Sequence, residues 1–381
     1  MRKITLGVLV ILVFACKPEK KEVPRPASPF EQIKIAHAKG FSIEKNDSGI
    51  TTIQITSPWP NSEIAYTYAL IPKDILAYTT LNRDAYDAIV TTPVERIIVT
   101  STTHIPALEA LGVMDKLVGF PTTDYISSKT ARKQIDEGKV KELGNNEEIN
   151  TEMTLALNPD VVVGFGISNQ NKAYETLQRS NIPVVYNGDW TEETPLGKAE
   201  WIKFFAPFFG KEAKADSVFK EIEKSYKSAK ILAQKASVRP TVLTGGLYKD
   251  VWYVAGGNSW MARFLEDAQT NYLWADTEDT GSLSLSMESV LSKAQNAEFW
   301  LNPSRITSYD ELKEANRHYL QFAAYENRSI YSNTITQGDT GGLIYYELAP
   351  QRPDLVLKDL IHIFHPELLP DHKLFFFKPL E

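Results

Sequence analysis

Two glutamates occupy matching places in a short pattern that occurs twice in the chain. Glu152 lies in residues 150–155 (NTEMTL), and Glu288 lies in residues 286–291 (SMESVL). In both copies a residue that can cap a helix is followed two positions later by the glutamate, then by a short helical pattern and a buried strand. Either carboxylate alone could simply complement the positive end of its helix. Their occurrence at equivalent places in two halves of the chain favours a shared role.

Motifs of nucleophilic and metal-dependent hydrolysis are absent from the sequence. The Gly-x-Ser-x-Gly pattern of α/β-hydrolases does not occur, and the closest segment, residues 257–261 around Ser259, lacks the second glycine. No HExxH or paired-histidine pattern indicates a metalloenzyme. The glycine-rich segment 337–342 lacks the spacing and the lysine of a phosphate-binding loop, so we expect a turn that borders a cleft. We therefore predict a protein that is not an enzyme, with no cofactor and no metal site of its own.

Length and charge narrow the class of protein. A chain of 381 residues with 43% apolar residues is long enough for two domains, each with its own core. The net charge of -7, without a basic run in the part expected to fold, argues against nucleic acid as a partner. The single cysteine, Cys16, excludes disulfides within the chain and a zinc site of the cysteine type.

The N-terminus has the pattern of an export signal. Arg2 and Lys3 precede an apolar run over residues 4–15, which is too short for a comfortable membrane span. Residues 13–16 (VFAC) resemble the lipobox of bacterial lipoproteins, in which the cysteine is lipidated; the alternative is an ordinary secreted protein with an incidental Cys16. Residues 17–29 contain four prolines and mixed charge, which predicts a flexible tether. We expect a lipid-anchored protein on the periplasmic side of the cell envelope.

One long helical pattern organises the rest of the chain. Residues 211–237 contain neither glycine nor proline, and the helix should span about 40 Å before Arg239-Pro240 stops it. Its apolar side chains recur every three or four residues on one face: Ala215, Phe219, Ile222, Tyr226, Ala229, Ala233 and Ala236. We assign residues 211–238 to a rigid helix that joins two lobes and leaves a cleft between them.

Short apolar strands alternate with helices on both sides of this helix. Such alternation predicts a parallel sheet covered on both faces, with ligands bound at the carboxyl ends of the strands. The first half has predicted strands at residues 96–100, 117–120, 161–163 and 183–186, and the second at 241–244, 251–255 and 299–301. The predicted organisation is a signal peptide (1–15), a tether (16–30), a β-rich extension (31–93), an N-terminal lobe (94–210), the connecting helix (211–238) and a C-terminal lobe (239–381). The extension shows no chemistry that its sequence identifies.

Three segments of this organisation resemble a known family. Residues 96–99 with 108–112, residues 151–163 (TEMTLALNPDVVV) and residues 286–291 match, in order, the opening strand and helix and the two glutamate patterns of ABC-transporter binding proteins for iron chelates, haem or cobalamin. The resemblance covers residues 94–364 and leaves out the extension and the tail 365–381. It implies two Rossmann-like lobes joined by one long rigid helix.

The resemblance also implies partners and functional residues. In the family one glutamate of each lobe binds an arginine of the membrane permease, and the matching residues are Glu152 and Glu288. Two exposed carboxylates on a rigid body would fix orientation more than affinity. The expected partners are therefore an ABC permease with its ATPase, a small-molecule metal chelate, and the membrane through the lipid anchor. We expect only small movements of the lobes on binding, because a single helix resists bending.

Aromatic side chains near predicted strand ends are the candidates for ligand binding. The set suits the broad apolar face of a corrin or porphyrin, although about half of it is expected to be core packing: His104, Tyr125, Phe165, Trp190, Trp252, Trp260 and Tyr345. Arg132 and Arg263 could serve an anionic siderophore, and Tyr125 or His104 could be an axial ligand of haem. Iron chelates are the broadest ligand class, and the iron or cobalt would belong to the ligand.

Three other functions remain possible at this point. A secreted α/β hydrolase would use Ser259 as its nucleophile. A zinc- or manganese-binding protein of the related cluster would place His104 on the metal, but would need further ligands from the second lobe. A structural or adhesive lipoprotein would fill the cleft between the lobes with side chains.

Overall fold

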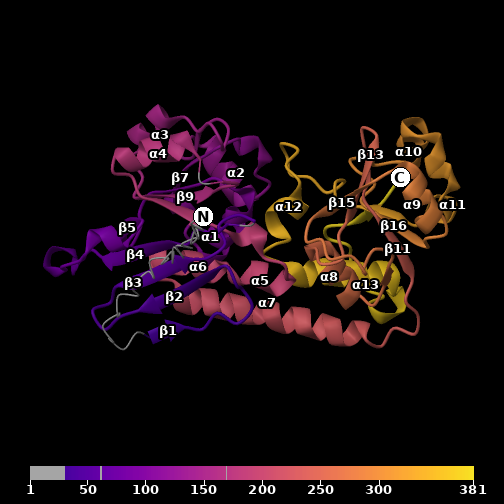
Figure 1. Ribbon diagram of the computed structural model, residues 1–381, viewed down its shortest axis with the longest axis horizontal. Coiled ribbons are helices and arrows are strands. Elements are labelled where there is room, and N and C mark those ends of the chain that lie inside the picture. Colours follow the sequence, from indigo (N-terminus) through magenta and orange to yellow (C-terminus); the bar gives the residue numbers. More distant parts are fainter. Residues whose placement is uncertain (1–30, 61, 169) are drawn as a thin grey trace, which may run out of the picture.

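The computed structural model describes residues 31–60, 62–168 and 170–381. The predicted signal peptide, tether and lipidation site at Cys16 lie outside these residues. The described chain forms an N-terminal sheet and two α/β halves, and one long helix, α7, runs along the base of both halves (Figure 1). The predicted α/β fold with two sheet-bearing lobes is confirmed.

The extension is a five-stranded sheet with the order β1-β2-β3-β4-β5. Its strands are β1 (Glu31–Ile33), β2 (Phe41–Lys45), β3 (Thr51–Ile55), β4 (Tyr66–Pro72) and β5 (Ala88–Thr92). In β3 every second side chain is buried, which is the pattern of a sheet with one face on a core. Phe41, Ile53 and Tyr68 share one buried cluster with strands of the first half, so the sheet packs on that half.

The first half contains a parallel sheet with the order β10-β9-β6-β7-β8. The strands are β6 (Ile97–Val99), β7 (Leu117–Phe120), β8 (Lys141–Glu142), β9 (Val161–Phe165) and β10 (Val184–Asn187). The helices that follow them are α1 (Ile105–Leu111), α2 (Lys129–Asp136), α3 (Thr151–Leu157) and α4 (Lys172–Arg179). Every residue of β6 and β7 is buried, as expected for a parallel sheet covered on both faces.

Two further helices complete the first half, and neither of them nor α2 was predicted. They are α5 (Pro195–Glu200) and α6 (Ile202–Phe209). All eight residues of α6 are buried, so its sequence has no polar face and shows no amphipathic stripe. Pro207 lies inside the helix and further obscures the pattern.

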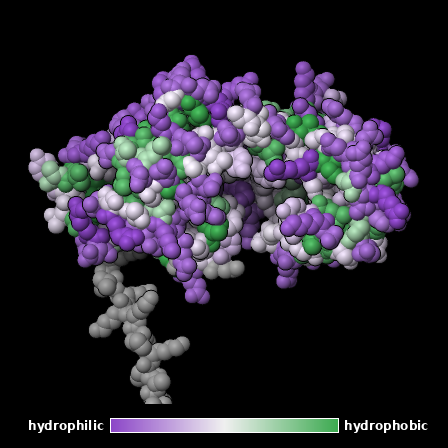
Figure 2. Space-filling model, turned by 90° about the horizontal axis from the view of Figure 1, so that it is seen from above, coloured by the Kyte–Doolittle hydropathy of each residue, from purple (hydrophilic) through white to green (hydrophobic). Residues whose placement is uncertain are grey.

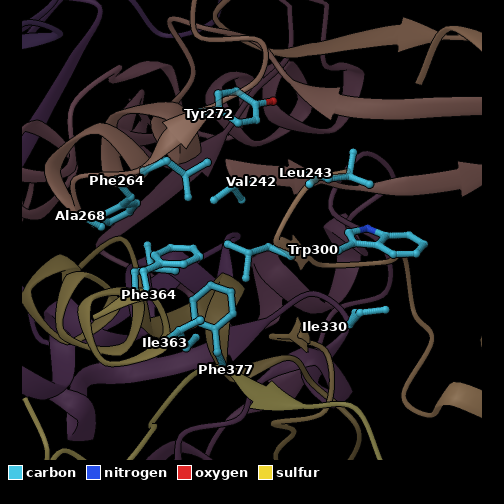
Figure 3. Packing of buried hydrophobic residues seen from close by; sticks show 14 of the residues in the cluster. Val242, Leu243, Phe264, Ala268, Tyr272, Trp300, Ile330, Ile363, Phe364 and Phe377 are labelled. Atoms are coloured by element: carbon cyan, nitrogen blue, oxygen red, sulfur yellow. The ribbon is translucent and has the colours of Figure 1, made fainter. Parts of the chain in front are cut away.

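The second half repeats the parallel scheme with an added antiparallel edge. Its main sheet has the order β14-β11-β16-β17-β18, in which β18 alone runs antiparallel to its neighbour, and β12, β13 and β15 form a separate antiparallel sheet. The strands are β11 (Thr241–Thr244), β12 (Gly246–Tyr248), β13 (Val251–Ala255), β14 (Asn271–Tyr272), β15 (Ser282–Leu285), β16 (Phe299–Leu301), β17 (Ile330–Ser332) and β18 (Lys378–Pro379). The helices are α8 (Trp260–Asp267), α9 (Met287–Ala294), α10 (Tyr309–Ala315), α11 (Ala323–Glu326), α12 (Ile344–Leu348) and α13 (Pro353–Phe364). Side chains from β11, α8, β16 and α13 pack together in its core (Figure 3).

The C-terminal tail belongs to this core. Phe376 and Phe377 are fully buried, and β18 pairs with β17 at the edge of the main sheet. The Asp359 carboxylate on α13 accepts the backbone N–H of Phe375, Phe376 and Phe377 and lies 2.7 Å from His372 Nε2. The tail therefore closes an edge strand that would otherwise expose unpaired backbone groups.

Helix α7 (Glu212–Ala233) is shared between the two cores. Ala215, Phe219 and Ile222 lie in the cluster of the first half and its extension. Tyr226, Ala229 and Ala233 lie in the cluster of the second half. The predicted stripe is therefore confirmed up to Ala233.

The helix ends earlier than predicted. Ala236, the last residue of the predicted stripe, lies beyond the end of α7 and is only half-buried. The neighbouring Gln234, Lys235 and Ser237 are exposed. Helical turns in water depend on tertiary packing of an apolar face, so the chain leaves the helix where this packing ends.

Candidate functional site

Hollows lie at the carboxyl ends of both parallel sheets. In the first half, residues that follow β6, β7 and β9 line a pocket of about 390 Å³, which includes Tyr125 and Phe165. In the second half, residues that follow β11, β16 and β17 line a pocket of about 430 Å³, which includes Trp260 and Tyr345. This is where an open α/β sheet places its ligand.

A larger pocket, of about 680 Å³, lies between the two halves. Figure 2 shows a recess between them on the face seen there. Trp190 and Lys198 line the pocket from the first half, and Trp260 and Thr280 line it from the second half. Trp260 also lines the strand-end pocket of the second half, so the two hollows adjoin.

Five of the seven aromatic candidates line these hollows. Tyr125 is exposed at the strand ends of the first half, and the Phe165 ring lies 5.4 Å from the Trp190 ring. The Trp260 ring lies 5.7 Å from the Tyr345 ring. These rings come from both halves and could contact a flat ligand between them. Burial raises the pKa of Tyr345, so its hydroxyl keeps its proton at neutral pH.

Two candidates belong to the core. Trp252 is fully buried in the second half, where its indole stacks against Trp300 with ring centres 5.3 Å apart and donates to the Thr244 carbonyl oxygen at 3.0 Å. Its position on β13 points it inward, which a strand-end assignment from sequence does not reveal. The prediction that Trp252 binds ligand is therefore wrong in this structure.

His104 is also fully buried, at the end of the 3₁₀ turn Thr102–His104. Its ring packs 5.4 Å from the Phe205 ring, and neither ring nitrogen has a hydrogen-bond partner among the described residues. Burial lowers the pKa of His104 to about 4, so the ring is neutral near pH 7. The solvent-facing or ligand-contacting position expected for His104 is not the one observed.

The extension contributes one wall of the pocket between the halves. Ser57, Trp59, Pro60 and Ser62 line it from the turn after β3. The Trp59 ring packs against Tyr186 of β10 at 5.4 Å, and a Cβ on Gly188 would approach the Ser57 carbonyl oxygen to 2.4 Å. The Thr191 hydroxyl donates to the same Ser57 oxygen at 3.0 Å and so joins the turn to the first half. The sequence alone identifies no role for the extension, and the structure places part of it in the lining of this pocket.

Two buried glutamates fasten the extension to the first half. The Glu192 carboxylate accepts the backbone N–H groups of Lys39 and Gly40 at 2.8 Å and the Trp201 indole N–H at 3.1 Å. Glu200 accepts N–H groups from residues 36–38. Burial acts to raise the pKa of Glu200, but the Lys203 ammonium and these N–H groups outweigh burial and lower it.

A second contact between the halves lies at α12. The Glu347 carboxylate accepts the backbone N–H groups of Ser127 and Ser128 at 2.6 and 2.8 Å, and the Thr340 hydroxyl donates to the Asp124 carbonyl oxygen at 2.8 Å. Burial raises the pKa of Glu347 to about 7, and the Glu109 carboxylate adds to this increase. The glycine-rich segment 337–342 predicted to border the cleft is part of this contact, which we call the α12 clasp (residues 337–347).

The sequence profile of one family, the periplasmic binding proteins, matches residues 97–334, more than half of the chain. The chain belongs to the periplasmic binding protein family. Its members are binding proteins rather than enzymes. They are found in the cell envelope, where they bind small molecules and work together with ABC permeases. The family resemblance found in the sequence is therefore confirmed, and the extension of this binding protein lies outside the matched segment.

Relatives and solved structures agree with this assignment. An uncharacterized lipoprotein of Methanocaldococcus jannaschii is 27% identical over 298 residues, which are 76% of this chain and 69% of that protein. The vitamin B12-binding protein of Vibrio parahaemolyticus is 27% identical over 130 residues, 34% of this chain and 44% of that protein. The fold is similar to a periplasmic heme-binding protein from Roseiflexus sp. RS-1, with a TM-score of 0.56, 21% identity, and coverage of 72% of this chain and 99% of that one.

The two glutamates expected to bind the permease are exposed on the binding protein. Glu152 lies in the first turn of α3, and Glu288 lies in the first turn of α9. The two helices belong to different halves (Figure 1). Hydrogen bonds from its own backbone N–H and from the Ser286 hydroxyl lower the pKa of Glu288, which keeps this carboxylate charged.

The residues named for the alternative functions have other contacts. Ser259 is the N-cap of α8, and its hydroxyl oxygen accepts the Ala262 N–H at 3.2 Å. Among residues 31–60, 62–168 and 170–381, no group of three His, Cys, Asp or Glu side chains could hold a metal ion. Within the same described ranges, no helix has both the length and the apolar character needed to cross a membrane.

The arginines considered for an anionic ligand are held elsewhere in the binding protein. Arg132 Nη1 donates to the Thr123 carbonyl oxygen at 2.7 Å. Arg263 Nη2 donates to the Asn258 side-chain oxygen at 3.0 Å. Neither arginine lines one of the hollows described above. The basic residues that line the central pocket are Lys39 and Lys198, and the sequence pattern singles out neither of them.

Proposed function

We propose that this binding protein captures a metal chelate between its two halves and delivers it to an ABC permease. The ligand classes are iron complexes with siderophores or haem, and cobalamin, and iron complexes are the class we favour. The observation that carries the proposal is the set of aromatic rings from both halves that line adjoining hollows. Several proteins of similar fold, and one relative, are named as heme-binding or vitamin B12-binding proteins. Their names support ligands of the same chemical classes here.

Direct titration tests this proposal. The mature protein is titrated with haemin, cyanocobalamin and ferric siderophores, and ligand absorbance and tryptophan fluorescence are recorded. Because Trp190 and Trp260 line the central pocket, ligand binding is expected to quench fluorescence with saturation at micromolar concentrations. If none of the three classes binds at these concentrations, the metal-chelate proposal is refuted.

Docking on the permease would use Glu152 and Glu288, one from each half. Their exposure and their places on different halves support this assignment. Two cationic groups on a partner could bind both carboxylates at once only when the binding protein is correctly oriented. We expect little movement of the halves when ligand binds, because α7 packs into both cores and the α12 clasp joins them on another side.

Membrane attachment would use Cys16. The lipobox-like residues 13–16 and the proline-rich residues 17–29 support a lipid anchor and a tether, and relatives in Methanocaldococcus jannaschii are named lipoproteins. The substitution Cys16→Ser is expected to move the protein from the membrane fraction to the soluble envelope fraction. Fractionation followed by immunoblotting checks this result. Unchanged membrane association of the variant would contradict lipidation at Cys16.

A further inference from the structure

Lys198 lines the central pocket without a carboxylate of the described chain at salt-bridge distance. Lys39, Glu192 and Glu193 also line this pocket, and the Glu192 carboxylate is engaged by the N–H groups of Lys39, Gly40 and Trp201. Among the described residues, no carboxylate oxygen lies within 4 Å of Lys198 Nζ, whereas Lys203 on the next helix pairs with Glu200 at 2.8 Å. Lys198 Nζ instead donates to the backbone oxygens of Asp189 at 3.1 Å and Trp190 at 2.9 Å. These bonds use two of the three donors of an ammonium group.

Burial makes this charge costly. It lowers the pKa of Lys198, although the more distant Asp189 and Glu192 carboxylates act to raise it. Transfer of an ammonium from water to a protein interior is unfavourable unless an anion or several hydrogen bonds compensate it. An anionic group in the pocket would supply the compensation that the described residues supply only in part.

Three tryptophans line the same pocket as this ammonium. Trp59 lines the pocket from the extension, Trp190 from the first half and Trp260 from the second half. Lys198 Nζ lies 5.7 Å from the centre of the Trp260 ring. The indole N–H groups of Trp190 and Trp260 are buried and have no acceptor among the described residues. The pocket therefore combines indole faces with donors for an oxygen-bearing group.

We propose that this pocket binds a ligand with a carboxylate on a flat apolar body, and that Lys198 binds the carboxylate. This inference rests on the proposed function and narrows it, because it favours carboxylate-bearing chelates over cobalamin, whose side chains end in amides. The recognition residue is a lysine of α5, in place of Arg132 and Arg263. Trp59 makes the extension a part of the recognition site, although the extension lies outside the segment matched to the family.

The test compares an acid with its ester. The full mature protein is titrated with haemin, which carries two carboxylates, and with haemin dimethyl ester, which carries none. Binding of haemin is expected to be about tenfold tighter or more, the effect of one hydrogen bond to a charged group. Lys198→Met is expected to remove this difference by weakening haemin binding alone. Lys235→Met, at an exposed position beyond α7, is the control and should leave both affinities unchanged.

Further variants and probes separate the possible outcomes. Lys198→Gln keeps a polar end and tests the charge if the methionine variant does not fold, as judged by circular dichroism. Trp59→Ala should weaken acid and ester by equal factors, because it removes an apolar surface. Ferric citrate and cyanocobalamin extend the comparison to a second carboxylate-bearing probe and to one without carboxylates.

Two results would overturn the inference. One is an equal effect of Lys198→Met on haemin and on its ester. The other is tight binding of cyanocobalamin without binding of either carboxylate-bearing probe. In both cases a metal chelate still binds, so the proposed function would survive. Absence of binding for the whole set would refute the proposed function itself.

Discussion

Reversal of both exposed carboxylates, Glu152→Arg together with Glu288→Arg, is expected to abolish ligand uptake through the ABC permease. Each substitution would place a positive charge where the permease is expected to present an arginine, and such like-charge contacts cost several kcal/mol. Uptake of radiolabelled ligand by cells or proteoliposomes measures the effect. Each single variant should reduce uptake less than the pair, because one docking point remains.

The affinity for ligand should not change in the double variant. Both glutamates lie outside the residues that line the central pocket, so titration of the purified protein should match the wild type. Glu175→Arg together with Glu314→Arg is the matched control, because it changes two exposed glutamates, one in each half, by the same charge. Full uptake by the Glu152→Arg, Glu288→Arg protein would exclude these carboxylates as docking points.

Glu347→Gln is expected to change how stability depends on pH. The pKa of Glu347 is raised from 4.5 to about 7 in the folded protein, so its stabilising contribution is fully present below pH 4.5 and is lost as the pH rises through about 7. An increase of this size corresponds to about 3 kcal/mol in the free energy of unfolding. The variant lacks this titration, so relative to wild type it should gain stability between pH 4.5 and pH 8.

His104 titrates in an overlapping pH range, and its effect on the pH dependence of stability is opposite to that of Glu347. Its pKa is lowered from 6.5 to about 4, so its contribution is present above pH 6.5 and is lost as the pH falls through about 4. The wild-type profile alone therefore mixes the two effects. The informative quantity is the difference between wild type and Glu347→Gln, obtained by urea denaturation at each pH.

A control variant and one contrary result decide whether Glu347 causes the expected pH dependence of stability. Glu314→Gln, on an exposed face of α10, is the control and should follow the wild-type profile throughout. Parallel profiles for wild type and Glu347→Gln would show that the Glu347 carboxyl titrates at the same pH in folded and unfolded chains. The α12 clasp would then have no part in the pH dependence of stability.

Elements with a local pattern could be predicted from sequence. Strands β7, β11, β13 and β16 have the predicted bounds, and α3 begins and ends where its asparagine caps predict. The apolar stripe of α7 could be predicted because one face of this long helix packs on the protein core while the other face remains in water. Helix α6 was missed for the opposite reason, because it is buried on all sides.

The candidate site was predictable only in part. Aromatic residues after strands could be named, but the sequence could not separate Trp260 in the pocket from Trp252 in the core, since both are tryptophans close to one strand. No sequence pattern indicated that Lys198 or Trp59 belongs to the candidate site. They meet in one pocket through contacts between segments more than a hundred residues apart, and no local pattern encodes such contacts.

The same limit applies to the α12 clasp. Glu347 meets Ser127 across 220 residues of sequence, and only the folded chain brings them together. The glycine-rich turn before α12 could be recognised as a turn, but its partner could not. A close approach explains one of its glycines, because a Cβ on Gly342 would lie 2.3 Å from the Tyr125 carbonyl oxygen.

Because α7 packs into both cores, the stability of each half depends on the other half. A nascent chain that has reached residue 240 exposes the apolar side chains of Tyr226, Ala229 and Ala233 until the second half folds onto them. Conversely, unfolding of either half removes packing contacts from α7, and the other half also packs on this helix. The two lobes should therefore denature as one cooperative unit, and a proteolytic cut that frees a single lobe should leave a fragment prone to aggregation.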